Sequence, residues 1–75
     1  MQKLIKYMAQ VHKDNPLWHI LVETAQSLPM YKAHLNYTKD VIIPEHPEVT
    51  PEELSQRLNM PLGEAFVILS ELKKI

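Results

Sequence analysis

The sequence predicts a small, mostly α-helical single domain, and three observations support this prediction. Apolar residues recur at intervals of three and four over residues 1–13 and 16–28, which is the spacing of one helix face. A helix-capping signature at Thr50 begins a further pair of helices over residues 50–75. With 75 residues, of which 45% are apolar, the chain is long enough for one globular domain and too short for two.

Two helices are expected in the first part of the chain. For residues 1–13, packing of the apolar face against the next helix is favoured over binding to a membrane surface. The helix over residues 16–28 has Pro16 at its first position, where a missing N–H is tolerated. Its apolar face is broad, with Leu17, Ile20, Leu21 and Leu28 at the centre and Trp18, Val22 and Ala25 beside them. Trp18 is the strongest single anchor, either in the core or at an oligomer contact.

Residues 30–49 are expected to be irregular, with a short strand and a proline-rich link. Residues 30–39 alternate between apolar and polar side chains, as strands do, yet Met30, His34 and Tyr37 would share one face of a helix. A helix or irregular structure is favoured there. The β-branched run within residues 40–43 makes this stretch a candidate for one short β-strand.

Residues 50–75 predict two short helices joined by a tight turn. Thr50 is a good N-cap, because its hydroxyl can accept the N–H of Glu53 while the Glu53 carboxylate reaches back to the Thr50 N–H. Asn59 suits the left-handed position that ends a helix, and Pro61 cannot continue the first helix. The core expected between the two helices comprises Leu54, Leu58, Met60, Ala65 and Leu69.

The stretch from Thr50 to Leu72 resembles the helix-turn-helix half of a winged-helix domain, and this resemblance covers about a third of the chain. It implies a helix-turn-helix at the C-terminal end, with the two-stranded wing absent, and a second helix that would read DNA. The outward positions of that helix are poorly suited to this task, since they are Pro61, Leu62, Gly63, Phe66, Val67 and Ser70. Glu64 and Glu71 are expected to repel phosphate.

We therefore expect a non-catalytic module that acts through protein–protein contacts, with a homodimer as one form. The expected contact surface comprises Leu62, Phe66 and Val67, with Trp18 as a further anchor. Val67 is placed on the surface because it points almost opposite to Leu69 and Leu72 on the same helix. Coverage of Phe66 and Val67 by another part of the chain is the alternative.

A second hypothesis is a small dimeric DNA-binding transcriptional regulator, which the resemblance supports. Its nucleic-acid contacts would come from Arg57, Ser70, Lys73 and Lys74, together with the lysines of the first helix. Charge disfavours it, because the net charge is −1 and Arg57 is the sole arginine. A regulatory subunit that recognises a larger enzyme or ribonucleoprotein is a third hypothesis.

No enzyme, cofactor or metal site is expected. The four histidines show no ligand spacing to one another, and the chain lacks cysteine. A single glycine leaves no Gly-rich loop for phosphate. The lack of cysteine fits a cytoplasmic protein, and we expect no membrane association, because no apolar run approaches the length of a membrane span.

Overall fold

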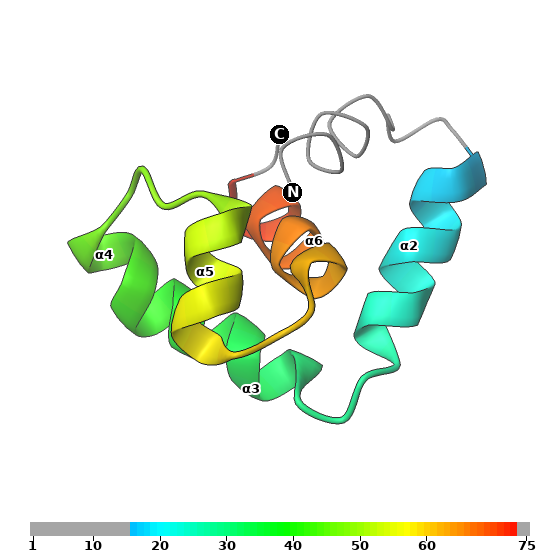
Figure 1. Ribbon diagram of the computed structural model, residues 1–75, viewed down its shortest axis with the longest axis horizontal. Coiled ribbons are helices and arrows are strands. Elements are labelled where there is room, and N and C mark those ends of the chain that lie inside the picture. The colour runs from blue at the N-terminus through cyan, green and yellow to red at the C-terminus, as the bar shows by residue number, and fades with distance from the viewer. Residues whose placement is uncertain (1–15, 74–75) are drawn as a thin grey trace.

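The computed structural model describes residues 16–73, and every regular element in this range is a helix (Figure 1). The elements are α2 (Pro16–Gln26), α3 (Tyr31–Tyr37), the π-helical segment η1 (Thr38–Ile42), α4 (Ile43–Glu45), α5 (Pro51–Leu58) and α6 (Leu62–Lys73). The mostly α-helical class predicted from the sequence is confirmed. The helix predicted over residues 1–13 lies outside the described residues.

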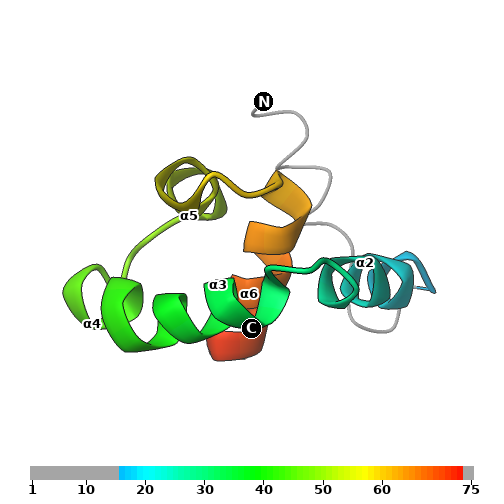
Figure 2. The ribbon, with the colours of Figure 1, turned by 90° about the horizontal axis from the view of Figure 1, so that it is seen from below.

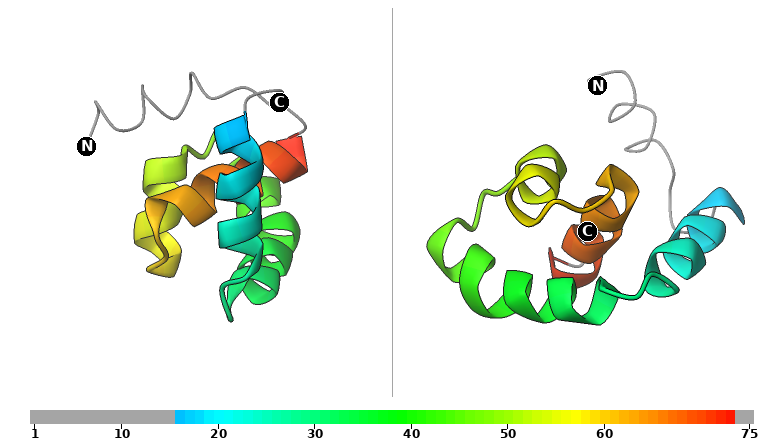
Figure 3. Two further views of the ribbon diagram at one scale, coloured as in Figure 1. Left: turned by 90° about the vertical axis from the view of Figure 1, so that its right-hand side faces the viewer. Right: turned by 60° about the horizontal axis from the view of Figure 1, so that its bottom comes forward.

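Helix α6 lies at the centre of the arrangement. Helix α5 packs along one side of it and α2 along another, while α3 contacts it from a third side (Figures 1 and 2). The same enclosure is visible when the lower side of the molecule is brought forward in Figure 3. Five of the 12 residues of α6 are buried: Glu64, Ala65, Val67, Ile68 and Leu69. A helix that is apolar on most sides is typical of such a central position.

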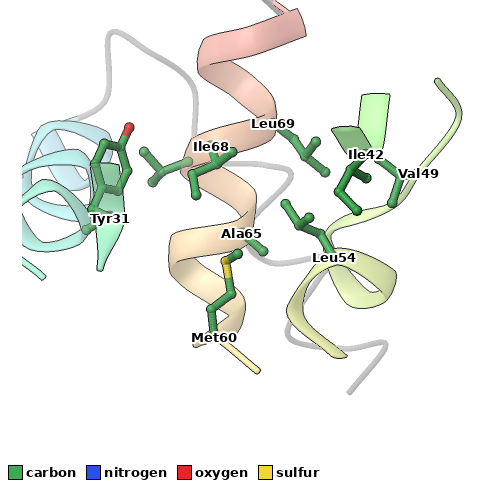
Figure 4. Close-up of a cluster of buried hydrophobic side chains, with 10 residues drawn as sticks. Tyr31, Ile42, Val49, Leu54, Met60, Ala65, Ile68 and Leu69 are labelled. Atoms are coloured by element: carbon green, nitrogen blue, oxygen red, sulfur yellow. The ribbon is translucent and has the colours of Figure 1, made fainter. Parts of the chain in front are cut away.

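The hydrophobic core forms on both flanks of α6. In Figure 4, Tyr31 of α3 lies on one flank, and Leu54 of α5 lies on the other with Ile42 and Val49. The core predicted for the C-terminal helix pair is confirmed, because Leu54, Met60, Ala65 and Leu69 are buried and Leu58 is half-buried. Leu54 has no exposed area, and full burial of such a side chain contributes about 1.5–3 kcal/mol.

Helix α5 begins with the capping box that the sequence predicts. The Glu53 N–H donates to Thr50 Oγ1 at 3.2 Å, and the Thr50 N–H donates to Glu53 Oε1 at 3.1 Å. The Thr50 N–H, followed by its hydroxyl, holds the pKa of the Glu53 carboxyl below its usual value. Helix α5 ends at Asn59, which adopts the predicted left-handed conformation with φ 53° and ψ 51°.

The turn between α5 and α6 is closed by Ser55. Its carbonyl accepts the N–H groups of Asn59 and Met60, and its hydroxyl donates to the Met60 carbonyl at 2.7 Å. These bonds satisfy the Ser55 carbonyl in the last turn of α5, and they fix the connection formed by residues 59–61. Helix α6 therefore starts at Leu62, within the range that the sequence indicates.

Residues 31–45 form one continuous helical run, so the strand predicted near residues 40–43 is wrong. The middle of this run is π-helical, because the Ile43 N–H donates to the Thr38 carbonyl five residues earlier. Pro44 accounts for the wider turn, since its ring would clash with the carbonyl four residues before it in α-helical geometry. Ile42 is only 5% exposed, so packing against the core outweighs its strand preference.

Replacing Thr50 with Ala should lower the free energy of unfolding by about 1 kcal/mol, because the capping box is lost. Urea unfolding followed by circular dichroism measures this change. Thr24→Ala is the matched control, since it makes the same chemical change at an exposed position within α2. A loss in Thr50→Ala no larger than in Thr24→Ala would show that the cap contributes nothing.

Candidate functional site

Two of the residues predicted to form a protein-contact surface meet in the structure as an aromatic pair. Trp18 of α2 and Phe66 of α6 pack edge to face, with ring centroids 5.8 Å apart and an interplanar angle of 72°. Trp18 is 8% exposed and Phe66 is half-buried. Leu62, one turn before Phe66, is also half-buried. The alternative in which the chain itself covers Phe66 therefore holds in part.

Val67 does not lie on the surface, and its predicted exposure is wrong. Its side chain is 1% exposed. The prediction assumed that α6 has one buried stripe, which faces α5. Because α2 and α3 cover further sides of α6, residues that point in different directions, such as Val67 and Leu69, are both buried. Val67 belongs to the core.

Of the residues that a DNA-binding role would need, one is engaged within the chain. Lys73 Nζ donates to the Val49 carbonyl at 3.2 Å. Ser70 is half-buried, and Arg57 is exposed at the end of α5. Lys74 lies outside the described residues. Within α6 only the acidic Glu71 is exposed, and a carboxylate is unsuited to contact with phosphate.

An exposed apolar face lies instead on α2. Leu17 is 50% exposed and Ile20 is 60% exposed, whereas Trp18 and Ala25 are buried. The sequence predicts a broad apolar face centred on Leu17, Ile20, Leu21 and Leu28, whereas the structure buries Trp18 and Ala25 and leaves Leu17 and Ile20 exposed. The helix carries a polar stripe, because His19, Glu23 and Gln26 recur at intervals of four and three, and all three are exposed. We call Leu17 and Ile20 the outer face of α2.

A polar contact that the sequence did not predict joins α3 to α6. His34 Nδ1 lies 2.6 Å from Glu64 Oε2, and the two side chains are 16% and 2% exposed. Glu64 was expected to repel phosphate at the surface, but it is buried in the structure. A buried carboxylate requires a hydrogen-bonding or charged partner, and the imidazole supplies it. No local pattern could pair these residues, because they are 30 positions apart.

His34 and Glu64 line a shallow depression of about 220 Å³ between the α2–α3 turn and the α5–α6 turn. Its lining comprises Leu28, Pro29, Met30, His34, Asn59, Pro61 and Glu64. Because Nδ1 of His34 faces the carboxylate, the other ring nitrogen, Nε2, has no partner among residues 16–73, and it is not buried. His34 therefore lines a largely apolar depression and keeps one imidazole nitrogen without a partner among the described residues.

Tyr31 lies one turn before His34 on the same helix. Its side chain is buried, and its hydroxyl has no hydrogen-bond partner in the described part of the chain. Burial raises the pKa of this hydroxyl above its usual value of 10.0, and the Glu71 carboxylate adds to the shift, while the nearby Gln26 side chain opposes it. The hydroxyl is therefore neutral near pH 7.

Across residues 16–73, no helix is long and apolar enough to cross a membrane. The same residues contain no group of three or more His, Asp or Glu side chains placed to hold a metal ion. Compared with known proteins, the chain matches no family model, no curated protein and no solved structure.

His34→Ala should lower the free energy of unfolding by about 3 kcal/mol, because Glu64 would keep a buried carboxylate without its partner. Replacing both residues with Leu should recover most of this loss, since an apolar pair needs no partner. Urea unfolding near neutral pH measures both effects. His19→Ala, at an exposed position on α2, is the control and should change stability by less than about 0.5 kcal/mol. Equal effects of the two His→Ala changes would contradict the pairing.

Tyr31 should make the protein sensitive to alkali. Because its pKa is raised in the folded state, its contribution to stability is complete below the ordinary value of 10.0 and is lost as the pH rises through the folded-state value. Tyr31→Phe should therefore unfold less readily than the wild type above pH ~10. Near neutral pH it should be equally stable or more stable by up to ~1 kcal/mol, because an unpaired hydroxyl is removed.

Urea midpoints measured from neutral pH into the alkaline range test this expectation. Tyr37→Phe is the control, since Tyr37 is 48% exposed. Identical alkaline profiles for Tyr31→Phe and the wild type would rule out a role for the buried hydroxyl.

Proposed function

We propose that this chain is a non-catalytic helical module that acts through protein–protein contacts and associates with itself through the outer face of α2. The observation that carries the proposal is the exposure of Leu17 and Ile20, at 50% and 60%, on neighbouring turns of one helix. Burial of one such side chain contributes about 1.5–3 kcal/mol, so two of them on each of two copies give a substantial driving force for association.

The charge of α2 is compatible with packing against a second copy of itself. Glu23 is the only residue between Pro16 and Gln26 with a formal charge at neutral pH. In an antiparallel pair centred on Ile20, the two Glu23 side chains lie at opposite ends of the contact, so their repulsion is weak. A two-fold symmetric contact of this kind is the commonest form of self-association.

The size of α2 sets the strength of this contact. Its 11 residues span about 16 Å, which is too short to bury the 1,200–2,000 Å² of a stable interface on its own. We therefore expect association in the micromolar range or weaker. The edge-to-face packing of Trp18 on Phe66 holds α2 against α6, so the outer face is presented on a fixed support.

In this proposal α5 and α6 form a helix-turn-helix scaffold rather than a DNA reader. The enclosure of α6 and the contact of Lys73 with Val49 weigh against the alternative of a dimeric DNA-binding regulator. That alternative keeps the support of its sequence resemblance. It requires an affinity for DNA that falls steeply with added salt, because phosphate contacts release counterions.

Light scattering across a wide range of protein concentration and salt tests the proposal. The wild type should show a mean mass that rises with concentration and does not fall at high salt. Ile20→Ser should need at least a tenfold higher protein concentration to reach the same mean mass. Because Ile20 is exposed, the variant should keep its helix content. Tyr37→Ser, which removes a similarly exposed apolar side chain from α3, should behave as the wild type.

A wild type that stays monomeric at all concentrations would overturn self-association. An equal decrease of the mean mass in Ile20→Ser and Tyr37→Ser would show that the contact does not depend specifically on the outer face of α2.

A further inference from the structure

Beyond protein contacts, we propose that Met30 and His34 bind a soft monovalent metal ion of the Cu(I) and Ag(I) class at the depression beside α3. Thioether sulfur and imidazole nitrogen are the uncharged protein ligands that suit such ions. Three features of the described structure point to this site: the helical spacing of the two residues, the orientation of the imidazole, and the electrostatics of the depression.

The spacing brings the two ligand side chains together. Met30 directly precedes α3, and its carbonyl accepts the His34 N–H at 2.9 Å, so the two residues stand one helical turn apart. Side chains at this spacing are neighbours on one helix face. Both residues line the same depression of about 220 Å³. Met30 is 55% exposed, so its side chain can rotate towards an ion without disturbing the core.

Glu64 prepares the imidazole for a metal. With the carboxylate 2.6 Å from Nδ1, the proton of a neutral His34 is held on Nδ1, and the lone pair of Nε2 remains available. Metal-binding histidines are typically oriented in this way by a carboxylate or carbonyl on their second nitrogen. Glu64 acts here as a positioning residue, because its carboxylate faces the imidazole.

The electrostatics favour a single positive charge. One monovalent cation on Nε2 balances the charge of the Glu64 carboxylate on the other side of the imidazole ring, whereas a divalent ion would leave an excess charge among the apolar walls formed by Leu28, Pro29 and Pro61. A hard ion such as Mg²⁺ or Ca²⁺ would also lack the oxygen ligands that it requires.

The other histidines of the described chain provide an internal comparison. Four residues before His19 the sequence has Asn15, and four residues before His46 it has Ile42, so neither has a methionine one turn away. The Met-x-x-x-His spacing recurs only at Met8 and His12, which lie outside the described residues. A test must therefore resolve individual side chains.

Nuclear magnetic resonance with ¹³C-labelled methionine methyl groups and histidine rings gives that resolution. Ag(I) in chloride-free buffer is the probe, since it resembles Cu(I) in ligand preference and is stable in air. We expect the Met30 methyl and His34 ring signals to shift together on titration, while the His19 ring signals stay in place. Met30→Leu and His34→Gln should each weaken Ag(I) binding at this site at least tenfold, and His19→Gln should leave it unchanged.

Glu64→Gln tests the positioning role. It should weaken Ag(I) binding about tenfold or more, because the imidazole loses its oriented tautomer. Competition with a chromophoric Cu(I) chelator should show one fewer Cu(I) ion retained by His34→Gln than by the wild type. Circular dichroism verifies the fold of each variant, and Met30→Leu keeps the test decisive because it changes an exposed side chain.

Several results would overturn the proposal. One is a shift of the Met30 and His34 signals no larger than that of His19. Another is Ag(I) affinity in Met30→Leu equal to that of the wild type, which would reduce the site to an ordinary surface imidazole. A third is an unchanged Ag(I) affinity in Glu64→Gln together with a loss of stability, which would show that the His34–Glu64 pair has only a structural role. None of these results depends on whether α2 forms a dimer.

Discussion

The enclosure of α6 is the constraint on which the rest of the structure depends. A helix with apolar residues on most sides must be covered on most sides, and α2, α3 and α5 take those positions. The enclosure also buries one acidic residue, Glu64, whose carboxylate needs His34 as a partner. It also leaves Glu71 as the only exposed residue of α6, while Leu17 and Ile20 on the outer face of α2 remain exposed.

The features that the sequence predicts correctly depend on residues close together in the chain. The capping box of Thr50 and Glu53, and the left-handed Asn59, involve neighbours three or four positions apart at most, so their chemistry is visible without the fold. The core of the α5–α6 pair follows for the same reason, since a short turn leaves two amphipathic helices few ways to pack.

The features that it misses depend on which helices meet. The position of Val67 was predicted from contact with one helix, whereas three helices contact α6. In α2 the predicted apolar face was centred on Leu17 and Ile20, whereas Trp18 and Ala25 are the buried residues. The strand near residues 40–43 was predicted from β-branched composition, and in the structure the burial of Ile42 within a helix outweighs that strand preference. In the depression, the spacing of Met30 and His34 is legible in the sequence, whereas the pairing of His34 with Glu64 exists only in three dimensions.

The π-helical segment before Pro44 acts as one extra residue within a helix. Each residue of an α-helix turns the chain by about 100°, whereas the wider turn of the π-helical segment takes up one additional residue. The segment therefore accommodates Pro44 within one helical run, and this run buries Tyr31 near its start and Ile42 near its end.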